Sequence, residues 1–113
     1  MKKYIFALLT SWACSTQALT LPYLVSIPES SQQHYIVYQQ SDNKFIHIVI
    51  VEVRGQHGSQ FNAKYIDCKN QSHRYFASAP TWKQLMQTPT RDENWFRWNP
   101  ITKYYGYAIC NIL

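Results

Sequence analysis

The sequence predicts an α+β domain: an antiparallel β-sheet arranged as a meander, with a C-terminal helix packed on it. Residues 34–79 contain β-rich segments separated by short runs of turn residues. Apolar residues recur at helical spacing after Pro100. Cys68 and Cys110 lie in the sheet region and in that predicted helix, so a disulfide between them would tether the helix to the sheet.

The first eighteen residues are typical of an export signal. Lys2 and Lys3 precede an apolar run over residues 4–10 that is too short to span a bilayer. We expect cleavage after Ala18; the alternative is lipidation at Cys14, whose preceding residues lack the leucine of a good lipobox. The protein is therefore predicted to be exported, either periplasmic or associated with the outer membrane or cell surface, and attached to a membrane only if Cys14 is lipidated.

Cleavage would leave 95 of the 113 residues, enough for one domain that buries about two-thirds of its unfolded surface. Residues 19–33 contain Pro22, Pro28 and a Ser/Gln cluster, which predict an irregular lead-in. Residues 34–113 then form the single sheet-and-helix domain.

The first strands follow from alternation and turn chemistry. "HYIVYQQ" (34–40) is a short strand, "SDN" (41–43) a turn, and "KFIHIVIVEVR" (44–54) the strongest strand of the chain. Both faces of that strand are apolar over its middle, so we expect a helix or a second subunit to cover each side. His47 falls on the opposite face from Glu52 and Arg54, which predicts a solvated Glu52–Arg54 pair and no site that includes His47.

Two further strands continue the meander. The glycines of "GQHGSQ" (55–60) predict a hairpin loop, "FNAKYIDC" (61–68) returns, and "HRYFASA" (73–79) follows across "KNQS" (69–72).

The chain beyond Pro80 is less regular. We expect one turn or a short strand over residues 81–87, ended by Pro89, and then a loop. Asn99 is a candidate N-cap for a C-terminal helix with Pro100 at its first position, and a final strand is the alternative.

Cys68 and Cys110 are the two cysteines left after cleavage, so one intramolecular pairing exists. Closing a loop of this length stabilises a domain by about 4 kcal/mol in the chain-entropy model. The disulfide would pin the C-terminal helix to the sheet.

The charge of the chain argues against nucleic acid as a partner. Without Lys2 and Lys3, nine of the eleven basic residues remain against six acidic ones, a net charge of +3. A mildly basic surface suits anionic partners, but no nucleic-acid-binding motif accompanies it.

Catalysis and metal binding are not predicted. The histidines, at 34, 47, 57 and 73, belong to no nucleophile or paired-acid motif and are interpreted as surface or strand residues. The spacing of Cys68 and His73 does not match common zinc sites, and an oxidised Cys68 cannot bind a metal. We therefore expect no enzyme activity, no catalytic residue, no metal and no cofactor.

Trp, Tyr and Phe make up 16% of the chain and concentrate in its last third. An aromatic and basic patch that suits a protein, glycan or flat apolar ligand would comprise Arg91, Trp95, Arg97, Trp98 and Lys103. The alternative is that these aromatic residues fill the interface between sheet and helix.

Several segments together resemble the CNP-one-like family of small exported bacterial proteins and, more distantly, the surface-adhesin protein E family. The resemblance lies in "GSQFNAKYIDC" (58–68), "RYFA" (74–77), Trp82, the aromatic stretch 95–98 and Cys110. It implies a six-stranded or similar antiparallel sheet with a disulfide-tethered C-terminal helix.

The adhesin family also implies a function: dimeric outer-membrane lipoproteins that bind host matrix proteins through the region around the first cysteine. The matching residues here are Lys64, Tyr65, Lys69, His73, Arg74 and Tyr75. This chain has a weaker lipobox and fewer basic residues in that region.

The sequence thus predicts a small exported, non-catalytic binding module for host extracellular-matrix proteins, envelope proteins or glycans. One alternative is a periplasmic structural or stress-related protein without a host ligand. The other is a small secreted hydrolase.

Overall fold

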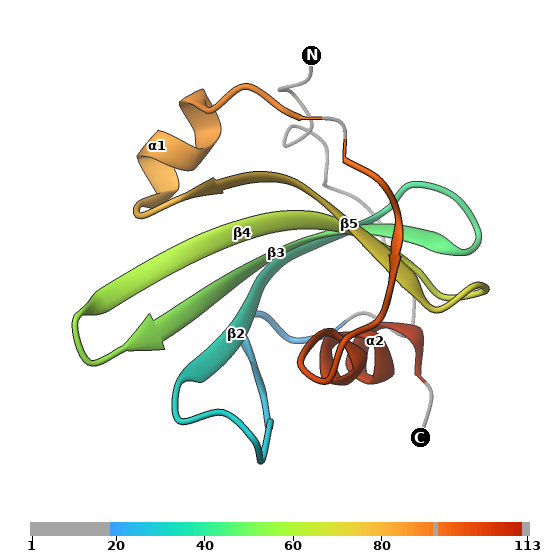
Figure 1. Cartoon of the computed structure of the whole chain (residues 1–113), viewed down its shortest axis with the longest axis horizontal. Helices are drawn as coiled ribbons and strands as arrows, with labels where there is room; N and C mark the ends of the chain where they lie inside the picture. Colours follow the sequence, from blue (N-terminus) through green and yellow to red (C-terminus); the bar gives the residue numbers. More distant parts are fainter. Residues whose placement is uncertain (1–18, 92, 112–113) are drawn as a thin grey trace.

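A computed structural model of the chain describes residues 19–91 and 93–111. Six antiparallel strands form one sheet in the order β1 to β6 (Figure 1). Their bounds are β1 (Tyr23–Val25), β2 (Gln33–Ser41), β3 (Ile46–Gly55), β4 (Gly58–Asp67), β5 (Ser72–Ala79) and β6 (Phe96–Arg97). Helix α1 (Trp82–Gln87) follows β5, and α2 (Thr102–Cys110) follows β6. The predicted α+β meander with a C-terminal helix is confirmed, and no helix within these residues is long and apolar enough to cross a membrane.

Turn residues close the hairpins where the sequence predicts them. The Asn43 side chain accepts hydrogen bonds from the backbone N–H groups of Phe45 (2.9 Å) and Ile46 (3.0 Å), which fixes the turn before β3. Gly55 pairs with Gly58 at the end of the β3–β4 hairpin, where Gly58 has φ of +125°. Only glycine adopts that backbone conformation without strain, so this hairpin depends on it.

Residues 19–33 are not wholly irregular, contrary to the prediction. They contain the short edge strand β1, whose Val25 pairs with His34 of β2. Val25 and Ile27 are buried in the core. The strand is three residues long, so its existence depends on pairing with β2 more than on any local pattern.

Helices lie on opposite sides of the sheet (Figure 1), which confirms that both faces of β3 are covered in part. The α2 side holds the larger core: Val25, Ile27, Ile36, Val49, Val51, Ile66 and Tyr105. The α1 side holds Ile50, Ala63, Ala77, Ala79 and Leu85. Leu85 of α1 packs over cross-strand partners Ala63 and Ala77, whose small side chains allow the close approach.

The predicted turn or short strand at 81–87 is the short helix α1. Thr81 caps it, since its hydroxyl accepts a hydrogen bond from the Gln84 N–H at 3.1 Å. The helix ends before Pro89, as expected.

Helix α2 confirms the preferred prediction for the C-terminal segment. The helix begins at Thr102 with Ile101 at its N-cap, so Asn99 and Pro100 lie in the turn before it and not at the predicted N-cap and first position. The Asn99 side-chain oxygen stabilises that turn, because it accepts hydrogen bonds from the N–H groups of Ile101 (3.0 Å) and Thr102 (2.6 Å). Gly106 lies against the indole of Trp98, and a Cβ there would come within 2.4 Å of two ring carbons. Glycine weakens a helix by about 1 kcal/mol relative to alanine, but here it is required for contact with Trp98.

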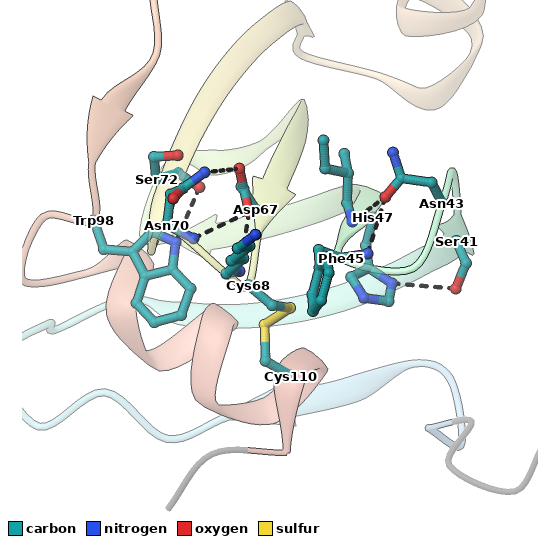
Figure 2. Close-up of a disulfide and its surroundings, with 12 residues drawn as sticks. Ser41, Asn43, Phe45, His47, Asp67, Cys68, Asn70, Ser72, Trp98 and Cys110 are labelled. Carbon is teal, nitrogen blue, oxygen red and sulfur yellow. Dashed lines mark hydrogen bonds between the residues drawn. A yellow bond between two sulfur atoms is a disulfide. The ribbon is translucent and has the colours of Figure 1, made fainter.

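The predicted disulfide joins Cys68, just after β4, to Cys110, the last residue of α2, with a Cα–Cα distance of 5.7 Å. Figure 2 shows Phe45 beside it; the Cys68 N–H donates to the Phe45 carbonyl at 2.9 Å. On the other side, the Trp98 indole N–H donates to the Ser72 carbonyl at 3.1 Å. The disulfide therefore fixes the end of α2 to a well-bonded end of the sheet.

Candidate functional site

The six residues predicted around the first cysteine do not form one surface. Lys64, His73 and Tyr75 point to the α2 side of the sheet, and Tyr65 and Arg74 point to the opposite side. Lys64 is 0% exposed and His73 is 4% exposed, so neither contributes to a surface. Lys69 is exposed in the β4–β5 turn.

The predicted aromatic and basic patch is also divided. Trp98 packs against Gly106 of α2, and the Lys103 ammonium lies 5.2 Å from the Tyr104 ring on the same helix. Arg91 forms an ion pair with Glu93 at 3.3 Å, and Arg97 is exposed in β6. Trp95 instead lies with residues on the other side of the sheet.

Members of both predicted sets meet on that other side. The Tyr65 ring lies 4.9 Å from the Phe76 ring and 6.3 Å from the Trp95 ring, centroid to centroid. The Arg74 guanidinium lies 4.8 Å from the Tyr65 ring centroid and 5.5 Å from that of Trp95. These distances are within the range of cation–π interaction, so the four side chains form one stacked cluster.

A second aromatic pair lies on the same side. Phe61 precedes Tyr65 on the same face of β4 and contacts Trp82 of α1 edge to face, with a centroid distance of 6.0 Å. Helix α1, which lies on this side of the sheet, also carries Met86; Trp82, Met86 and Trp95 are 39%, 42% and 41% exposed. We call this surface the aromatic face, made of Phe61, Tyr65, Arg74, Phe76, Trp82, Met86 and Trp95.

The alternative interpretation of the aromatic residues, that they fill the sheet–helix interface, holds for only some of them. Trp98, Tyr104 and Tyr105 pack in the core beneath α2. Trp82 and Trp95 belong to the aromatic face and keep substantial exposure.

A layer of buried polar side chains lies on the α2 side. The Lys64 ammonium donates a hydrogen bond to the Thr102 hydroxyl at 3.0 Å and lies 4.2 Å from the Tyr75 ring and 5.1 Å from the Tyr105 ring. No carboxylate in residues 19–91 or 93–111 forms an ion pair with Lys64. Burial without a counterion lowers the pKa of Lys64 to about 7.

His34 links β2 to α2 in this layer. Its Nδ1 is 2.6 Å from the Tyr105 hydroxyl, and its Nε2 is 2.8 Å from the Ser30 hydroxyl. Burial, and secondarily the charge of Lys64, lowers the pKa of His34. Burial also raises the pKa of the Tyr105 hydroxyl, so the phenol stays neutral.

His73 is the third basic group of the layer. Its Nδ1 is buried and has no hydrogen-bond partner. Burial, aided by the charge of Lys64 and opposed by a hydrogen bond with the Arg97 backbone, lowers the pKa of His73 to about 4. The imidazole is therefore neutral at physiological pH.

The remaining candidate groups are dispersed. His47 lies 3.3 Å from the Ser41 hydroxyl, and His57 is exposed in a hairpin. Glu52 pairs with Arg54 at 3.1 Å as predicted, but the Glu52 side chain is only 14% exposed, so the pair is not fully solvated. Across the part of the chain that the structure describes, no three His, Cys, Asp or Glu side chains gather where they could hold a metal ion.

No family model, curated protein or solved structure matches this chain. The resemblance to the CNP-one-like and adhesin E families therefore stays a prediction from the sequence.

Proposed function

We propose that this chain is an exported, non-catalytic binding module whose aromatic face binds a protein partner outside the cytoplasm. The observation that carries the proposal is the stack of Tyr65, Arg74 and Trp95, extended by exposed Trp82 and Met86. Trp, Tyr, Met and Arg are the residue types enriched at the centres of protein interfaces. Exposed apolar side chains that gather on one face mark interaction sites more often than scattered ones.

The scaffold suits binding because it holds these side chains in place. Phe61 and Tyr65 come from β4, and Arg74 and Phe76 from its neighbour β5. Ring contacts and the cation–π contacts restrict their rotamers before any partner arrives. Less side-chain entropy is then lost on association, which favours affinity.

The buried layer supports a role without catalysis. Lys64, with a pKa of about 7, would be a reactive amine if a substrate reached it. Lys64, His34 and His73 are 0%, 5% and 4% exposed beneath α2, so these basic groups are buried away from any substrate in solution. The proposal is for binding and not for hydrolysis.

The location follows from the sequence and is consistent with the fold. A disulfide in a chain of this size is compatible with an oxidising compartment outside the cytoplasm. Residues 1–18, including Cys14, lie outside the described residues, so cleavage after Ala18 or lipidation at Cys14 stays part of the proposal. Host matrix proteins and envelope proteins are the partners that the resemblance suggests.

Binding to a panel of purified extracellular-matrix proteins, envelope proteins and sulfated glycans tests the function. For a protein that binds the native chain, we expect Trp95→Ala and Trp82→Ala each to weaken binding about tenfold or more. Tyr107→Ala, an equally exposed aromatic residue on α2, is the matched control and should change affinity less than about twofold. Equal losses in all three variants, or binding to glycans alone, would contradict a protein-binding aromatic face.

A further inference from the structure

Three basic side chains from three different strands are enclosed in the layer between the sheet and α2. Lys64 comes from β4, His73 from β5 and His34 from β2, and each is at most 5% exposed. Each becomes positive when it binds a proton. The layer therefore joins groups of the same charge sign in a place that water does not reach.

The groups around Lys64 offer it no negative charge. Helix α2 contributes the Thr102 hydroxyl and the Tyr105 ring, and β5 contributes Tyr75 and His73. On β3, the residue paired with Lys64 is the apolar Val49. On β2, the charge of Lys64 lowers the pKa of His34. Within residues 19–91 and 93–111, Glu93 acts on the neighbouring Tyr75, and Glu93 is itself paired with Arg91.

Helix α2 is attached to the sheet in two different ways. Near its middle, Tyr105 contacts His34, and at its start Thr102 contacts Lys64; both contacts are non-covalent and involve the basic layer. At its end, Cys110 is covalently bound to Cys68. The contacts with the basic layer thus lie in the first half of α2, and the covalent bond lies at its end.

We propose that α2 is an acid-released cover: protonation of the layer formed by Lys64, His34 and His73 detaches the start of α2 from the sheet, and the Cys68–Cys110 disulfide retains its end. Added positive charges in this layer have no carboxylate to pair with among the described residues, and water can hydrate them fully only if α2 moves away. The lowered pKa values place the change between about pH 7, for Lys64, and about pH 4, for His73. Release would expose the apolar side chains Ile36, Val49, Val51 and Ile66.

Hydrogen exchange of the intact, oxidised chain at about pH 8 and about pH 4.5, corrected for intrinsic exchange, tests the release. We expect the protection factors of α2 amides to fall by at least about tenfold more than those of β3 and β4 at the lower pH. Lys64→Met should reduce that difference, and Lys69→Met, an exposed lysine, should not.

Two results would overturn the proposal. If α2, β3 and β4 lose protection together, acid unfolds the whole domain and α2 is not a separate cover. If α2 keeps its protection at the lower pH, protonation does not reach the layer. The wild-type profile decides between these outcomes even if Lys64→Met does not fold, and His73→Leu offers a second variant of the same layer.

Discussion

Removal of the disulfide by the double substitution Cys68→Ser and Cys110→Ser is expected to lower the free energy of unfolding by about 4 kcal/mol. The bond closes a loop with a sequence separation of 42 residues, and the chain-entropy model assigns about that value to a loop of this length. A domain of this size has a total stability on the order of 5–10 kcal/mol, so roughly half or more of that stability would be lost.

Urea unfolding of both proteins measures the effect, and reduced wild type is the control, since it should match the double variant. The bond also retains α2 over the core of Val49, Val51 and Ile66, so its loss should increase exposure of that apolar surface before global unfolding. A double variant as stable as the oxidised protein would show that the α2 contacts alone hold the helix.

The stability of the wild-type protein should rise by roughly 3 kcal/mol between about pH 7 and about pH 9.5, because of Lys64. Its pKa is about 7 in the folded state and 10.5 when unfolded. Between these values the unfolded chain binds a proton that the folded chain does not, so each step up in pH favours the folded state. The rise in stability should end near about pH 10. Above that pH the unfolded chain loses tyrosine protons that the folded chain keeps, because the pKa values of Tyr75 and Tyr105 are raised, and this lowers the stability of the folded state.

Lys64→Met should remove this slope. At about pH 7 it should also be more stable than wild type by roughly 2 kcal/mol. An apolar side chain of similar length replaces a buried charge, and this gain outweighs the loss of the hydrogen bond to Thr102. Denaturant unfolding across the pH range measures both effects. Lys69→Met is the matched control and should keep the slope; a wild-type stability that is flat over this range would contradict the burial of an unpaired Lys64.

The elements that the sequence predicts well are those with local signals. The alternation of 44–54 and the turn residues around Asn43, Gly58 and Asn70 specify the hairpins without reference to the rest of the chain. Asn99 likewise indicates where α2 begins to within three residues, since its side chain accepts a hydrogen bond from the N–H of Thr102, the first residue of the helix. Strand β1 is too short for such a signal and forms through pairing with β2. Helix α1 has a local cap at Thr81, but its six residues are too few for an apolar pattern, and it packs on β5.

The candidate site was harder to predict because it depends on which face each residue occupies. Alternation along β4 places Tyr65 and Lys64 on opposite faces, but the resemblance groups these two residues by position in the chain. Trp95 joins Tyr65 from a segment thirty residues later, which no local pattern indicates. Lys64 is buried because α2, near the end of the chain, lies over it, and the sequence around Lys64 does not indicate this.

Hydroxyl-radical footprinting of the protein in its native envelope fraction, compared with the purified chain, tests the binding role of the aromatic face most directly. We expect lower oxidation of Trp82, Met86 and Trp95 in the envelope fraction, because a partner covers them. Tyr107 and Phe45, exposed away from that face at 36% and 38%, should be oxidised equally in both samples. Equal oxidation of Trp82, Met86 and Trp95 in the two samples, or protection of Tyr107 and Phe45 instead, would contradict the proposed role of the aromatic face.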